Sequence, residues 1–160
     1  CRYKKNKGFI NGLMKYVGSR KVHWLGFSNI EYIKHYKPYM CDSSSWKTGA
    51  RFASFNLFLG NSKFAKLNKK FFTKPDFLNG DQRRIFDRIS QLGFDKFELA
   101  KPEAWIGGQS VVRNLNAASY ICLSLEIEKK LNTFYFQAST SFYDIEMLLS
   151  NYQRLKGVRA

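Results

Sequence analysis

The sequence predicts an α/β fold, with its strands in the first half of the chain and mostly helices in the second. Residues 22–27 and 38–41 have the pattern of short apolar strands, and the intervening residues 30–36 have the spacing of a helix. From residue 81 onward, apolar residues recur at helical spacing instead. A chain of 160 residues is long enough for one domain with a substantial core.

The remaining elements are expected from the same patterns. A helix within residues 2–20 is expected to pack on the sheet. A strand is expected near 52–59, with a second strand directly after it, and residues 94–100 are expected to form a connector or an edge strand. Helices are expected at 81–92, at 109–131 and from 140 or 141 to 157. The chain has no internal repeat and no low-complexity tract.

The composition favours a polyanionic partner. The chain carries 27 Lys and Arg against 12 Asp and Glu, a formal net charge of +15. A positive field of this size attracts nucleic acid first and an acidic membrane surface second. A hydrophobic content of 44% with 17% aromatic residues argues against a disordered chain. There is no apolar run of about 18 residues, so no transmembrane helix is predicted.

The cysteines and histidines do not form a metal-binding pattern. Cys1, Cys41 and Cys122 lie far apart, and only His23 and His35 could join them. A structural zinc site takes about four such ligands, so no metal is expected. Phosphate-binding and dinucleotide-binding glycine motifs are also absent, and no cofactor is expected. An odd cysteine count without a disulfide framework favours a reducing compartment, the cytoplasm.

A basic and aromatic segment follows the strand–helix–strand unit and is the candidate nucleic-acid surface. Its lysines supply charge for phosphates and its phenylalanines supply flat faces for bases. The alternative is a solvated lysine face over a hydrophobic edge. The residues concerned are Arg51, Lys63, Lys66, Lys69 and Lys70, interleaved with Phe64, Phe71 and Phe72.

Asp42 is the candidate catalytic residue. It follows the second strand and precedes Ser43, Ser44 and Ser45. Parallel sheets place their chemistry at the carboxyl ends of the strands, and serines there could keep the carboxylate ionised for attack on an electrophilic carbon. Alternatively, Asp42 only caps the following turn. A serine nucleophile is not indicated, because no histidine is linked to these serines in the sequence.

The run VHWLGFSNIEYIKHYKPYMCDSSSW resembles a late part of the barrel in the queuine tRNA-ribosyltransferase family. It is most similar to the bacterial and phage relatives that insert deazaguanines into DNA, in which an aspartate precedes hydroxyl residues and a tryptophan. The resemblance implies that residues 1–60 are the strand–helix–strand end of a TIM-like (β/α) barrel. Residues 61–160 would then be a basic, mainly helical C-terminal extension packed on it within a single domain.

The resemblance also implies a reaction and roles for several residues. Asp42 would attack C1′ of a nucleotide in DNA or tRNA, guanine would leave, and a deazaguanine base would replace it. His23 and Gly26 would lie on the neighbouring strand, and Ser43, Ser44 and Trp46 would also line the substrate site. The side chain of Trp46 would either stack on a base or pack under the barrel mouth. The expected location is the cytoplasm of a bacterial or phage-infected cell.

A complete (β/α)₈ barrel takes roughly 250 residues. The other strands, with the second aspartate that acts as general acid and base, are therefore expected upstream of Cys1 or on another chain, in a homo-oligomer or a mixed assembly. The zinc cluster of the tRNA enzymes has no counterpart in this sequence. The competing interpretation is a non-enzymatic basic protein of a ribonucleoprotein or virion that binds nucleic acid through its charge.

Overall fold

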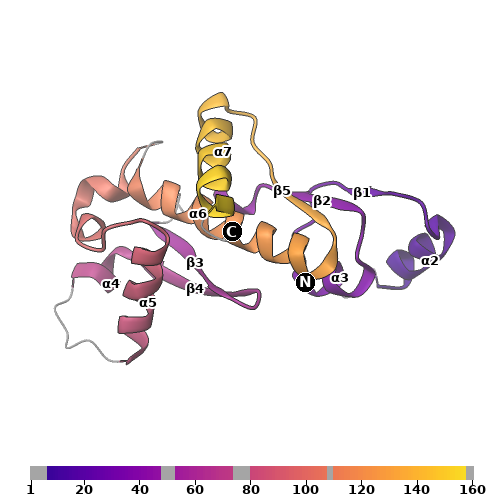
Figure 1. The fold of residues 1–160 in the computed structure, drawn as a ribbon, viewed down its shortest axis with the longest axis horizontal. Coiled ribbons are helices and arrows are strands. Elements are labelled where there is room, and N and C mark those ends of the chain that lie inside the picture. The colour runs from indigo at the N-terminus through magenta and orange to yellow at the C-terminus, as the bar shows by residue number, and fades with distance from the viewer. Residues whose placement is uncertain (1–6, 48–52, 74–79, 108–109, 158–160) are drawn as a thin grey trace.

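The computed structural model describes residues 7–47, 53–73, 80–107 and 110–157. It is a mixed α/β structure with a small parallel sheet and a mostly helical second half (Figure 1). In chain order the elements are α2 (Lys7–Val17), β1 (His23–Trp24), α3 (Ile30–Tyr36), β2 (Met40–Ser43), η1 (Ser45–Lys47), β3 (Ser54–Gly60), β4 (Lys63–Asn68), α4 (Lys69–Thr73), α5 (Gly80–Gln91), η3 (Glu98–Ala100), η4 (Pro102–Trp105), α6 (Val111–Leu131), β5 (Phe134–Gln137) and α7 (Phe142–Gly157).

The parallel sheet has the strand order β1-β2-β5. His23 pairs with Met40, and Asp42 pairs with Phe136 on the other side of β2. The helix α3 connects β1 to β2, and α6 leads into β5, so every strand is entered or left by a helix. The predicted second strand was placed slightly too early, because β2 runs through Asp42 and Ser43 rather than ending at residue 41. The strand β5, only 4 residues long, was not predicted.

The long buried helix predicted over residues 109–131 is α6, and it lies at the centre of the molecule (Figure 1). The Ser110 side chain caps its first turn by accepting a hydrogen bond from the Arg113 N–H, and Asn132 ends it in a left-handed conformation. Buried residues lie on all sides of this helix, which packs against β3, β5 and α7. Neither α6 nor any other described helix is long and apolar enough to cross a membrane.

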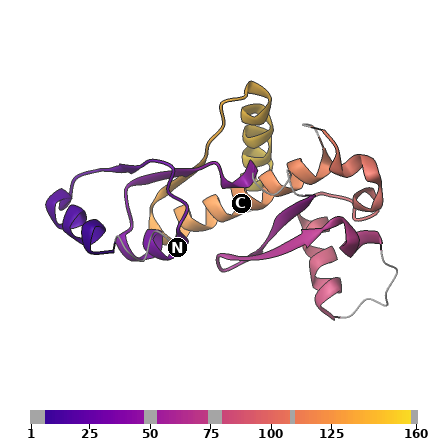
Figure 2. The same cartoon turned by 180° about the vertical axis from the view of Figure 1, so that it is seen from behind.

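The antiparallel hairpin of β3 and β4 packs against α6 through β3, which also contacts α5 (Figures 1 and 2). Phe55 and Leu57 of β3 are fully buried. Residues 94–100 form a turn and the short 3₁₀ helix η3 rather than an edge strand. The division expected at residue 60, within a single domain, falls at the turn of this hairpin, and β5 from the second part completes the sheet of the first part.

One face of the parallel sheet is covered and the other is open. Cys41 and Tyr135 are buried beneath the helices, whereas Phe134 and Phe136 are 36% and 47% exposed. Alternate residues of a strand point to opposite faces, so the exposed phenylalanines share the face of Asp42. The described residues do not form a closed barrel.

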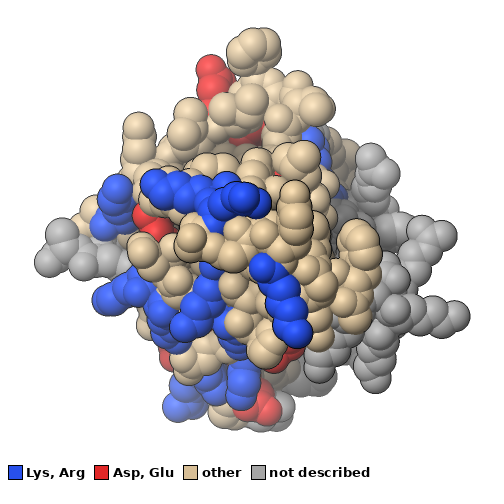
Figure 3. All heavy atoms as spheres, turned by 90° about the vertical axis from the view of Figure 1, so that its right-hand side faces the viewer, with Lys and Arg blue, Asp and Glu red and all other residues tan. Residues whose placement is uncertain are grey.

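The first helix was predicted to pack on the sheet, and this was wrong. The helix α2 lies at one end of the molecule beyond α3 (Figure 1), and its apolar residues Phe9, Leu13 and Tyr16 are exposed. Asn11 and Tyr36, which share a hydrogen bond, connect it to α3. Figure 3 views this end, where Lys and Arg side chains clearly outnumber acidic ones.

Candidate active site

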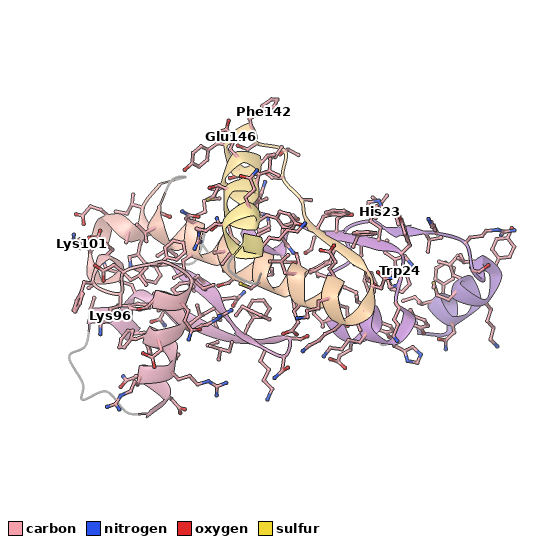
Figure 4. All side chains as sticks on the ribbon, viewed as in Figure 1. His23, Trp24, Lys96, Lys101, Phe142 and Glu146 are labelled. Atoms are coloured by element: carbon pink, nitrogen blue, oxygen red, sulfur yellow. The ribbon has the colours of Figure 1, made fainter. Side chains whose placement is uncertain are left out.

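Asp42 lies where β1 and β2 end, with its carboxylate held from the neighbouring strand. His23 Nε2 lies 2.9 Å from Asp42 Oδ1, and in the tautomer that carries hydrogen on Nε2 the histidine donates to this oxygen. The Gly26 backbone N–H donates to the same oxygen at 3.2 Å. His23 and Trp24 leave β1 on opposite sides (Figure 4), so only the histidine faces the carboxylate. The structure thus brings together three of the predicted site residues.

Gly26 is required here for its backbone conformation. Its φ is +62°, in the left-handed region that other residues rarely adopt. A Cβ at this position would meet no atom within 4 Å, so space is not the constraint. The left-handed turn ends β1 after Trp24 and directs the Gly26 N–H back toward Asp42.

Both hydrogen bonds go to Oδ1, which leaves Oδ2 without a partner among the residues that the structure describes. The Asp42 side chain is 19% exposed and that of His23 is 39% exposed, so the site is partly open to solvent. A carboxylate with one oxygen fixed and the other free can attack a carbon electrophile from a defined direction. It can equally accept a hydrogen bond from a ligand.

The serines after Asp42 do not support its carboxylate. The Ser43 hydroxyl is buried, accepts the Ser45 N–H at 3.1 Å and donates to the Ser45 hydroxyl at 2.9 Å. Ser44 is exposed, and no hydrogen bond joins it to Asp42 within the described ranges. Since Ser43 makes the local cap, Asp42 does not serve as the turn cap that was its alternative role.

Trp46 packs inside the protein. Its side chain is fully buried, and its indole N–H donates to the Ala138 carbonyl at 3.1 Å. The Asn116 side chain of α6 donates to the Trp46 carbonyl, which fixes the backbone of η1 as well. The sequence left two roles open for Trp46, and in the structure it is a packing residue. It lies below the loop that joins the end of β2 to η1, residues 42–47, which we call the Asp42 loop.

A buried carboxylate that the sequence analysis did not single out holds this loop to α6 and α7. The Asp144 side chain is 1% exposed and forms ion pairs with Arg113 and, at 3.1 Å, with Lys47. Burial alone would raise the pKa of Asp144, but hydrogen bonds from Ser139 and Lys47 and the charge of Arg113 bring it below its usual value. The only signal in the sequence is the spacing of Ser141 and Asp144, which is typical of a helix cap.

The underside of β2 is apolar. Burial, with the adjacent Asp42 charge, raises the pKa of the Cys41 thiol to about 12. Burial likewise raises the pKa of the neighbouring Tyr135 to about 12. Both groups are therefore neutral at physiological pH, and Cys41 has a packing role rather than the properties of a reactive thiol.

The predicted nucleic-acid residues lie apart from Asp42, along β4 and α4. Lys63, Lys66 and Lys70 are exposed and Lys69 is half-buried. The interleaved phenylalanines are half-buried in aromatic contacts: Phe64 with Phe58 and Tyr120, and Phe71 and Phe72 with Phe86. Their faces are thus used in packing, as the alternative of a lysine face over a hydrophobic edge requires. Arg51 lies outside the described residues.

No group of three His, Cys, Asp or Glu side chains within the described ranges could hold a metal ion. Comparison with known proteins adds no family to this geometry. No protein-family model matches the chain, and neither a curated protein nor a solved structure shows significant similarity to it.

Proposed function

We propose that the chain is the C-terminal portion of a base-exchange transglycosylase, in which Asp42 is the nucleophile. The observation that carries this proposal is the geometry of the Asp42 carboxylate. Oδ1 is fixed by His23 and by the Gly26 N–H, while Oδ2 has no partner among the described residues. The resemblance of residues 22–46 to the queuine tRNA-ribosyltransferase family supplies the reaction class.

In the proposed reaction, Asp42 Oδ2 attacks C1′ of a nucleotide whose base is flipped from the stack. The C1′–Oδ2 bond forms as the bond from C1′ to the guanine nitrogen breaks. The electron pair leaves with guanine, which takes a proton from a general acid. Oδ1 becomes the carbonyl oxygen of the ester and keeps its two hydrogen bonds, so the carboxyl group does not need to turn. A deazaguanine then attacks C1′ through its ring nitrogen as the C1′–Oδ2 bond breaks, its ring N–H proton passes to the same group, now acting as a general base, and Asp42 is released as a carboxylate.

The general acid is proposed to come from outside the described residues. The sheet order β1-β2-β5, with helices on one face and an open face that carries Asp42, Phe134 and Phe136 on the other, supports a partial (β/α) barrel. The remaining strands, either upstream in the same protein or on a second chain, would cover the open face and bring the second carboxylate to Asp42.

The second candidate is a non-enzymatic nucleic-acid-binding protein. The formal charge of +15 and the exposed lysines of β4 and α4 favour it. This function does not require Asp42, so a substitution of Asp42 distinguishes the two candidate functions.

The test is covalent trapping in the full-length protein. A guanine-containing oligonucleotide is incubated without an incoming base, and the products are separated on a denaturing gel. The proposal predicts an adduct that Asp42→Asn abolishes, with affinity for the oligonucleotide retained. Glu146→Gln, which neutralises an exposed carboxylate of α7, is the matched control and should still form the adduct. An adduct that persists in Asp42→Asn, or tight binding by the wild type without any adduct, contradicts the proposal.

A further inference from the structure

A pocket of about 470 Å³ opens between α5 and the end of the β3–β4 hairpin. It belongs neither to the Asp42 site nor to the predicted lysine surface. One stripe of α5, from Gly80 through Arg84 and Arg88 to Gln91, forms one wall. Phe58, Leu59 and Gly60 of β3 line the other.

The three arginines of the pocket are Arg83, Arg84 and Arg88. Arg88 is fixed, since its Nε donates to the Phe58 carbonyl at 2.8 Å and its Nη1 to Gln91 at 3.2 Å. An arginine carries five N–H donors, so part of this guanidinium fork stays available. Arg83 and Arg84 are exposed and have no ion-pair partner in the part of the chain that the structure describes.

Two carboxylates also line the pocket. Glu126 is already engaged, because it accepts the N–H groups of Asn61 and Ser62 at 2.8 and 2.9 Å and pairs with Lys130 at 3.5 Å. Asp87 is exposed and unpaired among the described residues. The pocket therefore carries a net positive charge. Asp87 is the one carboxylate lining it that has no partner among the described residues and so opposes the arginines.

We infer that this arginine pocket binds the phosphodiester backbone of the nucleic acid. Arginine forks match phosphate oxygens with paired hydrogen bonds, and a pre-positioned Arg88 loses little side-chain entropy on binding. The pocket has the size of small-ligand sites, which span about 300–1,000 Å³, and so admits a phosphate with its sugar. The inference rests on the proposed nucleic-acid partner but not on the reactivity of Asp42.

The test uses a short oligodeoxythymidylate, which contains no guanine and cannot undergo the proposed exchange. Binding to the full-length protein is followed by fluorescence anisotropy at several salt concentrations. Arg83→Ala/Arg84→Ala should weaken binding roughly tenfold or more at low salt. It should also lower the slope of log Kd against log salt by about 1.4, since each lost phosphate contact to a single strand contributes about 0.7.

Three variants separate a built pocket from diffuse charge. Arg83→Lys/Arg84→Lys keeps the charge but should recover only part of the affinity, because lysine cannot form the paired contact. Asp87→Asn should strengthen binding. Lys129→Ala removes one exposed charge from α6. It should show neither the loss of affinity of the arginine variants nor the gain of Asp87→Asn.

Equal losses in Arg84→Ala and Lys129→Ala, or no gain in Asp87→Asn, would overturn the inference. So would a double alanine variant that loses inorganic pyrophosphate binding but keeps the oligonucleotide, because the pocket would then serve a free phosphate compound. Each variant is checked by circular dichroism. Since oligodeoxythymidylate cannot react, failure of this inference is distinct from failure of covalent trapping by Asp42.

Discussion

Replacing Asp144 by Asn should destabilise the fold more than any other single charge removal described above. The carboxylate is 1% exposed and holds Lys47 and Arg113, whose side chains are 29% and 26% exposed. Removing one partner of a fully buried pair costs about 3–5 kcal/mol. Since water screens the two cations in part, we expect about 2–3 kcal/mol here.

Urea unfolding followed by fluorescence measures this loss of unfolding free energy. In thermal unfolding, Tm should fall by about 4–12 °C. Glu98→Gln is the control, because Glu98 pairs with Lys101 at the surface and its removal should change stability by about 0.5 kcal/mol or less. A loss in Asp144→Asn as small as that of the control would refute the assignment of Asp144 as the residue that fixes η1 to α6 and α7.

The pH dependence gives a second readout of the same residue. The folded-state pKa of Asp144 lies below its usual value. Its stabilisation is therefore complete above the unfolded pKa of about 4 and is lost as the pH falls through the folded pKa. The stability difference between wild type and Asp144→Asn should be constant at neutral pH and shrink in acid. A difference that grows in acid would contradict the ion pairs.

Three further outcomes follow from the site. Gly26→Ala should cost about 1–2 kcal/mol of unfolding free energy, because the φ of Gly26 is +62°. It should also reduce covalent trapping, because the backbone N–H would be displaced from Asp42. Unchanged stability would exclude the left-handed turn. Trp46→Phe should cost about 1–3 kcal/mol in urea unfolding, since the Ala138 carbonyl loses its donor, and a neutral result would mean that this hydrogen bond is not formed. Cys41, with a pKa of about 12, should resist iodoacetamide in the native protein and react after unfolding, as peptide mass spectrometry would record; rapid native labelling would show that it is not buried.

The sequence was informative where the pattern is local. The spacing of apolar residues predicted α6 and α3, and the strand–helix–strand order placed Asp42 at the end of a strand. His23 and Gly26 were expected on the strand beside Asp42 only from the resemblance of residues 22–46. The pairing of β1 with β2 does bring His23 to Asp42, whereas Gly26 lies in the turn after β1.

Features that depend on distant residues were not predicted. The pairs of Asp144 with Arg113 and Lys47 join segments far apart in the chain, and a serine-to-aspartate spacing is equally typical of a helix cap. The strand β5 is too short to show an alternating pattern. The sequence did not decide whether the phenylalanines beside the lysines bind bases or pack inside the protein. Which aromatic faces are buried depends on the helices that cover the hairpin.

The central claim is that Asp42 forms a covalent bond to a nucleotide sugar. Peptide mass spectrometry of the full-length protein after incubation with a guanine-containing oligonucleotide tests it most directly. We predict a sugar-linked adduct on the peptide that contains Asp42, and its absence in Asp42→Asn. An adduct on a different residue, or oligonucleotide binding that saturates without any adduct, would contradict the claim and favour the non-enzymatic function.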